Sequence, residues 1–117
     1  MDLINELKCL GADMDSALVR FIGNSQLLEM LMKKLPDSIE QNSGIEHDIE
    51  SGNISSAISK AHTLKGNTGN LSVTPLYSAY TEITNLLRQG KIPEAKAMLK
   101  EILPTQEKIV ETIKKYM

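Results

Sequence analysis

His62 and Lys65 are the two residues whose types and spacing could support chemistry. Both belong to the stretch Ala61-His62-Thr63-Leu64-Lys65-Gly66, in the second half of a helix expected to begin near Asn53. A neutral imidazole can attack phosphorus through a ring nitrogen and form a phosphoramidate bond. An ammonium group three residues further along the same helix can reach the imidazole edge and offset the negative charge of the added group. An anion attached to His62 would therefore lie beside a cation.

Small residues surround His62 on the expected helix surface, namely Ser59, Gly66 and Gly69. Two glycines inside a helix cost about 1 kcal/mol each relative to alanine, so stability alone does not favour this composition. Because glycine permits the close approach of another backbone, we expect a macromolecule to dock over His62 on these three residues. The alternatives are a solvated surface role for His62 and Lys65, and helix packing for the two glycines.

The helix that carries His62 should be amphipathic. Its apolar residues recur at intervals of three and four, which at about 100° per residue gathers them into one stripe facing a core. His62 lies roughly 100° from the centre of that stripe, so we expect its imidazole to be exposed. The residues of the stripe are Ile54, Ala57, Ile58, Ala61, Leu64 and Leu71.

Helical patterns also cover the first part of the chain. Residues 2–10 predict a short helix, and Asp13 can cap a second one that ends at Gly23. Asn24 or Ser25 should cap a longer helix that runs to Ile39. Because the apolar spacing continues beyond Pro36, we expect that proline to kink this helix and not to break it.

The second part of the chain is helical too. Ser43 and Glu46 could form a capping box for one extra turn. Thr74-Pro75 predicts a helix start with Thr74 as the cap, and Pro93 predicts the start of a last helix that Pro104 should bend. With short turns and no alternating strand pattern, the sequence predicts an all-α protein, an antiparallel up-down four-helix bundle with one or two short extra N-terminal helices.

Composition excludes several classes of protein. The chain has 117 residues, 41% hydrophobic and 24% charged, so we expect one globular domain over residues 1–117. A net charge of −2 and 3% aromatic residues argue against a nucleic-acid partner. Two histidines and one cysteine, without metal-ligand spacing, predict no metal site.

The location of the protein is expected to be cytoplasmic, with no membrane partner. No apolar run approaches the ~20 residues that cross a bilayer, and the start at Met1 shows no secretory signal. The single Cys9 has no partner for an internal disulfide, and we expect it to pack as a small hydrophobic residue. The start at Met1 also favours a free-standing protein over a fragment of a hybrid kinase.

Ala-His-Thr-Leu-Lys-Gly, followed by Gly69-Asn70-Leu71, resembles the core motif of histidine-containing phosphotransfer (HPt) domains, His-x-x-Lys-Gly. The resemblance extends back to Gly11-Ala12-Asp13 and forward to Ile83. It implies a four-helix bundle in which His62 is the phosphoacceptor and Lys65 stabilises the charge of the phosphate. Family members often have Gln or Glu at the position of Thr84, whose side chain is shorter, so Thr84 is not part of the expected site.

The resemblance implies a phosphorelay intermediate of a two-component system. His62 would accept a phosphoryl group from a receiver-domain aspartate or a histidine kinase and pass it to a response-regulator receiver aspartate. The expected partners are therefore a response-regulator receiver domain and a hybrid sensor histidine kinase. The domain itself should be a monomer, not a kinase, and should need no cofactor, because the magnesium ion belongs to the partner receiver.

Two other functions stay open. In the dimerisation domain of a sensor kinase, an acidic residue normally follows the histidine, whereas Thr63 follows His62 here, and the chain has no glycine-rich nucleotide loop. The second alternative is a non-catalytic helical adaptor for protein–protein interaction, in which His62 is incidental. The direction of phosphate flow does not follow from the sequence.

Overall fold

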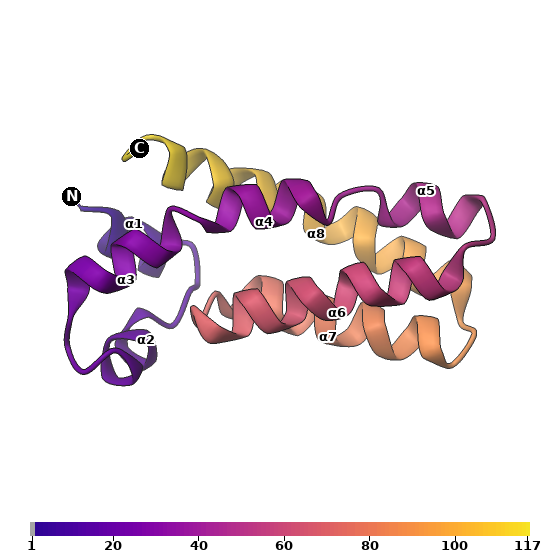
Figure 1. Ribbon diagram of the computed structural model, residues 1–117, viewed down its shortest axis with the longest axis horizontal. Coiled ribbons are helices and arrows are strands. Elements are labelled where there is room, and N and C mark those ends of the chain that lie inside the picture. Colours follow the sequence, from indigo (N-terminus) through magenta and orange to yellow (C-terminus); the bar gives the residue numbers. More distant parts are fainter. Residues whose placement is uncertain (1) are drawn as a thin grey trace.

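The computed structural model describes residues 2–117, and every regular element within that range is an α-helix (Figure 1). The expectation of an all-α fold is therefore confirmed for the described residues. In chain order the helices are α1 (Leu3–Cys9), α2 (Met14–Arg20), α3 (Ser25–Met32), α4 (Leu35–Gln41), α5 (Ile45–Glu50), α6 (Ile54–Asn70), α7 (Thr74–Arg88) and α8 (Ile92–Lys114).

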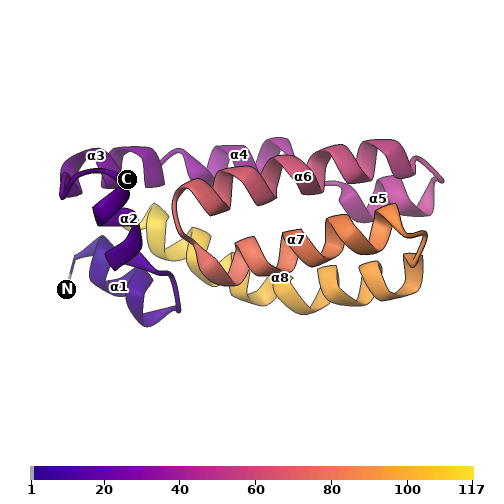
Figure 2. The ribbon, with the colours of Figure 1, turned by 90° about the horizontal axis from the view of Figure 1, so that it is seen from below.

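Three long helices, α6, α7 and α8, build most of the molecule. Successive long helices reverse direction, with α6 packed on α7 and α7 packed on α8 (Figures 1 and 2). The shorter α4 and α5 follow one another along the same side and pack on α6 and α8. The interior between them is apolar, and its most deeply buried residues include Ala57, Ala61, Leu64, Leu76, Ile83, Leu87, Ala95, Ile109 and Ile113.

The boundaries of α6 follow from its sequence. The side chain of Asn53 accepts a hydrogen bond from the Ser56 amide (3.4 Å), which satisfies a free amide of the first turn. At the other end Ser72 has a φ of 56°, and the Val73 amide donates to the Thr68 carbonyl (2.9 Å). This left-handed residue closes the helix where a glycine is usual.

Pro36 separates α3 from α4, so the expected kink is wrong. The helix that starts at Ser25 ends at Met32, and a new one starts at Leu35 with Pro36 in its first turn. A proline ring clashes with the carbonyl four residues earlier, which is that of Met32, and its missing amide costs nothing in a first turn. The apolar spacing continues to Ile39 only because α4 resumes along the same core.

Two expected caps are also wrong, although both helices exist. Gly44, with a φ of 89°, precedes α5, while the Ser43 hydroxyl donates backwards to the Glu40 carbonyl (2.7 Å). Thr74 is the first residue of α7 and not its cap, because its hydroxyl donates to the Ser72 carbonyl (3.2 Å). In both places a left-handed residue turns the chain into the helix without a side-chain cap. Pro104 lies inside α8, which continues through it.

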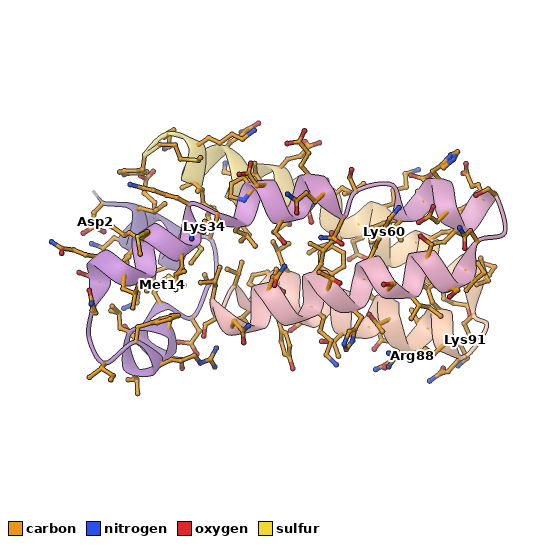
Figure 3. The ribbon with its side chains drawn as sticks, viewed as in Figure 1. Asp2, Met14, Lys34, Lys60, Arg88 and Lys91 are labelled. Atoms are coloured by element: carbon orange, nitrogen blue, oxygen red, sulfur yellow. The ribbon has the colours of Figure 1, made fainter. Side chains whose placement is uncertain are left out.

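The three N-terminal helices gather at the end of the molecule where α6 ends and α8 finishes (Figures 1 and 2). Met14 is buried there, and Figure 3 shows it beneath α3. Cys9 is exposed, so the expectation that it packs as a hydrophobic residue is wrong. It follows the buried Leu7 by two positions, which turns its side chain away from the core. No described helix has the length and apolar character needed to span a membrane.

Candidate functional site

His62 is exposed on α6 and borders a groove with a volume of about 480 Å³. The groove lies between the second half of α6, the start of α7 and α2, a helix distant in the sequence. The residues that line it include Ser16, Arg20, His62, Lys65, Gly66, Gly69 and Tyr77. The imidazole is therefore accessible to a partner, as the amphipathic pattern of α6 predicted.

Four of the five residues singled out in the sequence line this groove together, namely His62, Lys65, Gly66 and Gly69. Ser59 does not line it. Ser59 is exposed one turn before His62, and its carbonyl accepts a hydrogen bond from the Thr63 hydroxyl (3.0 Å). The spacing of α6 brings the first four together because they lie within two turns of one helix face.

The two glycines have different surroundings. A β-carbon built at Gly66 would meet nothing within 4 Å, so Gly66 is open to solvent on the side of the groove. A β-carbon at Gly69 would lie 2.8 Å and 2.9 Å from two ring carbons of Tyr77. Gly66 therefore leaves room for a docking partner, whereas Gly69 leaves room for a side chain of α7.

Lys65 is half-buried, and within residues 2–117 it makes no ion pair. Its methylene stem can lie against the helix surface while the ammonium stays in the groove. Lys60, five residues earlier, instead forms a 2.7 Å ion pair with Asp48 of α5, and Figure 3 shows Lys60 on the α5 side of α6. The Lys65 ammonium is thus available to an incoming anion next to His62, and that of Lys60 is not.

Arg20 is a groove residue that the sequence did not single out for the site. Its Nη1 donates hydrogen bonds to the carbonyls of Gly69 (2.6 Å) and Asn70 (2.8 Å), at the C-terminus of α6. A cation there satisfies carbonyls that have no partner inside the helix and interacts favourably with the helix dipole. Arg20 and Gly69 are 49 positions apart in the sequence, so no local pattern could have predicted the contact.

Asp13 and Thr84 complete the surroundings. Asp13 caps α2, and hydrogen bonds from the Ser16 amide (3.1 Å) and hydroxyl (2.8 Å) lower the pKa of its carboxyl group. Thr84 is buried, and its hydroxyl donates to the Tyr80 carbonyl (2.7 Å) within α7. Thr84 is not among the residues that line the groove.

Comparison with protein families identifies the kind of site. The family model of the Hpt domain matches residues 26–114, which includes all of α6, α7 and α8. The chain belongs to the Hpt domain family. The suspected resemblance is therefore confirmed over the matched range, while its extension back to Gly11 stays a prediction.

An Hpt domain is a histidine-containing phosphotransfer module of two-component signalling, which works with receiver domains and histidine kinases. Such domains are phosphotransfer intermediates and not kinases. Comparisons with curated proteins and with solved structures gave no match. The matched range contains the His-x-x-Lys-Gly motif, at His62, Lys65 and Gly66.

Proposed function

We propose that this Hpt domain is a phosphorelay intermediate in which His62 is the phosphoacceptor and Lys65 stabilises the charge of the phosphoryl group. The observation that carries the proposal is the exposure of His62 in a groove that also holds the unpaired ammonium of Lys65. The open space over Gly66 supports docking of a partner at the same place.

The transfer step requires no cofactor bound by this chain. A ring nitrogen of neutral His62 attacks the phosphorus of an aspartyl phosphate, so that a phosphorus–nitrogen bond forms and the phosphorus–oxygen bond breaks. The aspartate leaves as a carboxylate, and the imidazole, now cationic, loses its remaining N–H proton to water. Lys65 offsets part of the phosphoryl charge. The reverse step passes the group to a second receiver.

The partners and assembly belong to the same proposal. The donor and acceptor are a receiver domain of a hybrid sensor histidine kinase and that of a response regulator, with the magnesium ion held by the receiver. The protein acts as a cytoplasmic monomer whose 117 residues form one domain. In this interpretation α3, α4 and α5 together form one member of an antiparallel four-helix bundle, and α6, α7 and α8 form the other three. The short α1 and α2 are the extra N-terminal helices.

A phosphotransfer screen tests the proposal. Receiver domains from the same genome are labelled with radioactive acetyl phosphate and then mixed with the Hpt domain. We expect at least one receiver to transfer an acid-labile label to the wild type, and none to the His62→Gln variant. His47, exposed on α5, provides the matched control, because His47→Gln should take up label as the wild type does.

Label on His62→Gln equal to that on the wild type would contradict the proposal. Binding of a receiver without any transfer would favour the non-catalytic adaptor. The mass in solution distinguishes the remaining alternative, because a kinase dimerisation domain is an obligate dimer and this protein should sediment as a monomer.

A further inference from the structure

The C-terminal end of α2 exposes two large apolar side chains that do not belong to the core. Val19 is 80% exposed and Ile22 is 93% exposed, the highest values among the large apolar residues that the structure describes. They are three positions apart at one corner, which we call the α2 corner (Val19 to Ile22). Apolar side chains gathered on a surface are typical of a protein–protein contact.

Ile22 has an unfavourable backbone conformation in addition to an exposed apolar side chain. The Ile22 amide donates to the Val19 carbonyl (3.1 Å) and the Gly23 amide to the Leu18 carbonyl (2.7 Å), so Ile22 is the left-handed residue that ends α2. Its φ is 57°, a conformation that glycine or asparagine adopts readily and a β-branched residue does not. Stability of the isolated domain would favour another residue at this position.

The α2 corner continues the groove that His62 borders. Ser16 and Arg20 line that groove, and the same two residues line an adjoining depression together with Asp15 and Val19. One surface therefore runs from His62 across Arg20 to Val19. Figures 1 and 2 both place α2 beside the end of α6.

The position of α2 is held by contacts on both sides. The Arg20 guanidinium binds the last carbonyls of α6, and the Asp13 amide donates to the Ser72 carbonyl (2.9 Å) in the turn before α7. Gly11, with a φ of 96°, brings the chain close to Pro75, because a β-carbon there would lie 3.2 Å from the proline ring. The apolar corner is thus presented at a defined distance from His62.

That distance suits one globular partner. Gly69 follows His62 by seven residues, so Arg20 attaches α2 about 10 Å from His62 along the α6 axis. A standard protein interface covers about 800 Å² on each side, a patch of roughly 16 Å radius. A partner centred on His62 therefore reaches the end of α6, where Arg20 attaches α2.

Lys65 and Arg20 contribute positive charge to the surface that runs from His62 to Val19, and Val19 makes its edge apolar. The two carboxylates on the same surface are engaged within the chain, because Asp13 caps α2 and Asp15 pairs with Lys8 (3.2 Å). This arrangement suits a partner that brings an anionic phosphorylated aspartate to His62 and apolar residues to the edge.

We propose that Val19 and Ile22 form the apolar half of the surface on which the receiver domain docks, and that they determine its affinity and not the chemistry at His62. This inference rests on the proposed phosphorelay function. The two side chains bury their area only in the complex, which accounts for the residue type at Ile22.

The test compares the wild type with the double variant Val19→Gln/Ile22→Asn. Glutamine is a good helix former, and asparagine tolerates the left-handed conformation, so the variant should fold with an unchanged circular dichroism spectrum. With the fastest receiver from the screen, we expect the KM for phosphorylated receiver to rise at least tenfold while kcat at saturation stays within twofold. Met30→Gln is the matched control, because Met30 is 53% exposed on α3 and lines none of these surfaces; its KM should be unchanged.

The outcomes separate the two proposals. If no receiver labels wild-type His62, the phosphorelay function fails. If the wild type is labelled but the double variant has the wild-type KM, the docking surface on α2 is wrong and the function stands. An equal rise in KM for Met30→Gln, or a wild-type dimer that the double variant dissociates, would also overturn the α2 assignment.

Discussion

At the scale of single residues, the surroundings of Lys60 and Lys65 on α6 decide which ammonium group is available to a phosphate. Lys60 and Lys65 both belong to α6, yet only Lys60 forms an ion pair, with Asp48, and Ser56 also donates to that carboxylate (2.9 Å). The hydrogen bond from Lys60, and to a smaller extent the one from Ser56, lowers the pKa of the Asp48 carboxyl group. The position of Lys65 in the groove leaves its charge for an incoming phosphate.

Lys65→Ala should slow phosphoryl transfer about tenfold, which corresponds to ~1.4 kcal/mol of lost interaction between the ammonium and the phosphoryl group. Because Lys65 is partly exposed, the effect should shrink as salt is added. Rapid-quench kinetics with labelled receiver measures the rate. Lys60→Ala removes the same charge from the same helix outside the groove and should leave the rate unchanged. Equal rates for Lys65→Ala and the wild type would remove Lys65 from the site.

Gly66→Ala should stabilise the protein, and Gly69→Ala should not. Alanine at Gly66 meets no neighbour, so the free energy of unfolding should increase by about 1 kcal/mol. Alanine at Gly69 would overlap the Tyr77 ring, and overpacking typically costs about 1–3 kcal/mol, enough to cancel or reverse that gain. Urea denaturation gives both values. In a Tyr77→Ala background Gly69→Ala should become stabilising, while the gain from Gly66→Ala should be unchanged. A similar gain for both glycine variants in the wild-type background would disprove the contact.

At the scale of helices, the ends were predicted best where a side chain closes them locally. Asp13, Asn24 and Asn53 each accept a hydrogen bond from a first-turn amide of the following helix. These bonds join residues three apart, so the sequence alone determines them. Pro36 was misjudged because the apolar pattern continues across the break, and periodicity does not reveal whether the backbone does.

Arg20→Ala should loosen α2 without unfolding the molecule. Loss of the two hydrogen bonds to the end of α6 should lower the local stability of α2 by about 1 kcal/mol. Hydrogen exchange of the α2 amides should accelerate roughly fivefold, while exchange in α7 stays unchanged. Arg88→Ala, at the far end of α7 (Figure 3), is the control and should leave α2 protected. Unchanged exchange in α2 of Arg20→Ala would show that other contacts hold this helix.

At the scale of the whole molecule, the two ends of the described chain are joined. Glu6 of α1 binds the Lys115 ammonium (2.7 Å) and accepts a hydrogen bond from the Tyr116 hydroxyl, beside the end of α8. The hydrogen bond from Lys115 and then that from Tyr116 lower the pKa of Glu6. The hydrogen bond to Glu6, with burial, raises the pKa of Tyr116 to about 12. The short helices at the N-terminus are thus fastened to the last turn of the chain.

This connection should make stability depend on pH at both extremes. A lowered carboxyl pKa means that the contribution of Glu6 is present above its unfolded pKa, near 4.5, and is lost as the pH falls through the folded value. The contribution of Tyr116 is present below about 10 and is lost as the pH rises through about 12. The urea concentration at the midpoint of unfolding should therefore decrease as the pH is lowered below about 4.5. This decrease should be less steep in Glu6→Gln. Lys115→Met should act in the same direction and not add to Glu6→Gln; fully additive effects would disprove the coupling.

The sequence by itself determined most of the helices, the family and the motif that contains His62 and Lys65, because helical periodicity, local caps and motif spacing act over a few residues. It also predicted that His62 is exposed. Only the tertiary structure decided that Gly69 faces Tyr77 while Gly66 faces solvent, that Arg20 binds the end of α6, and that the α2 corner borders the groove. These contacts join residues far apart in the chain, and their geometry depends on how whole helices pack, which no local pattern encodes.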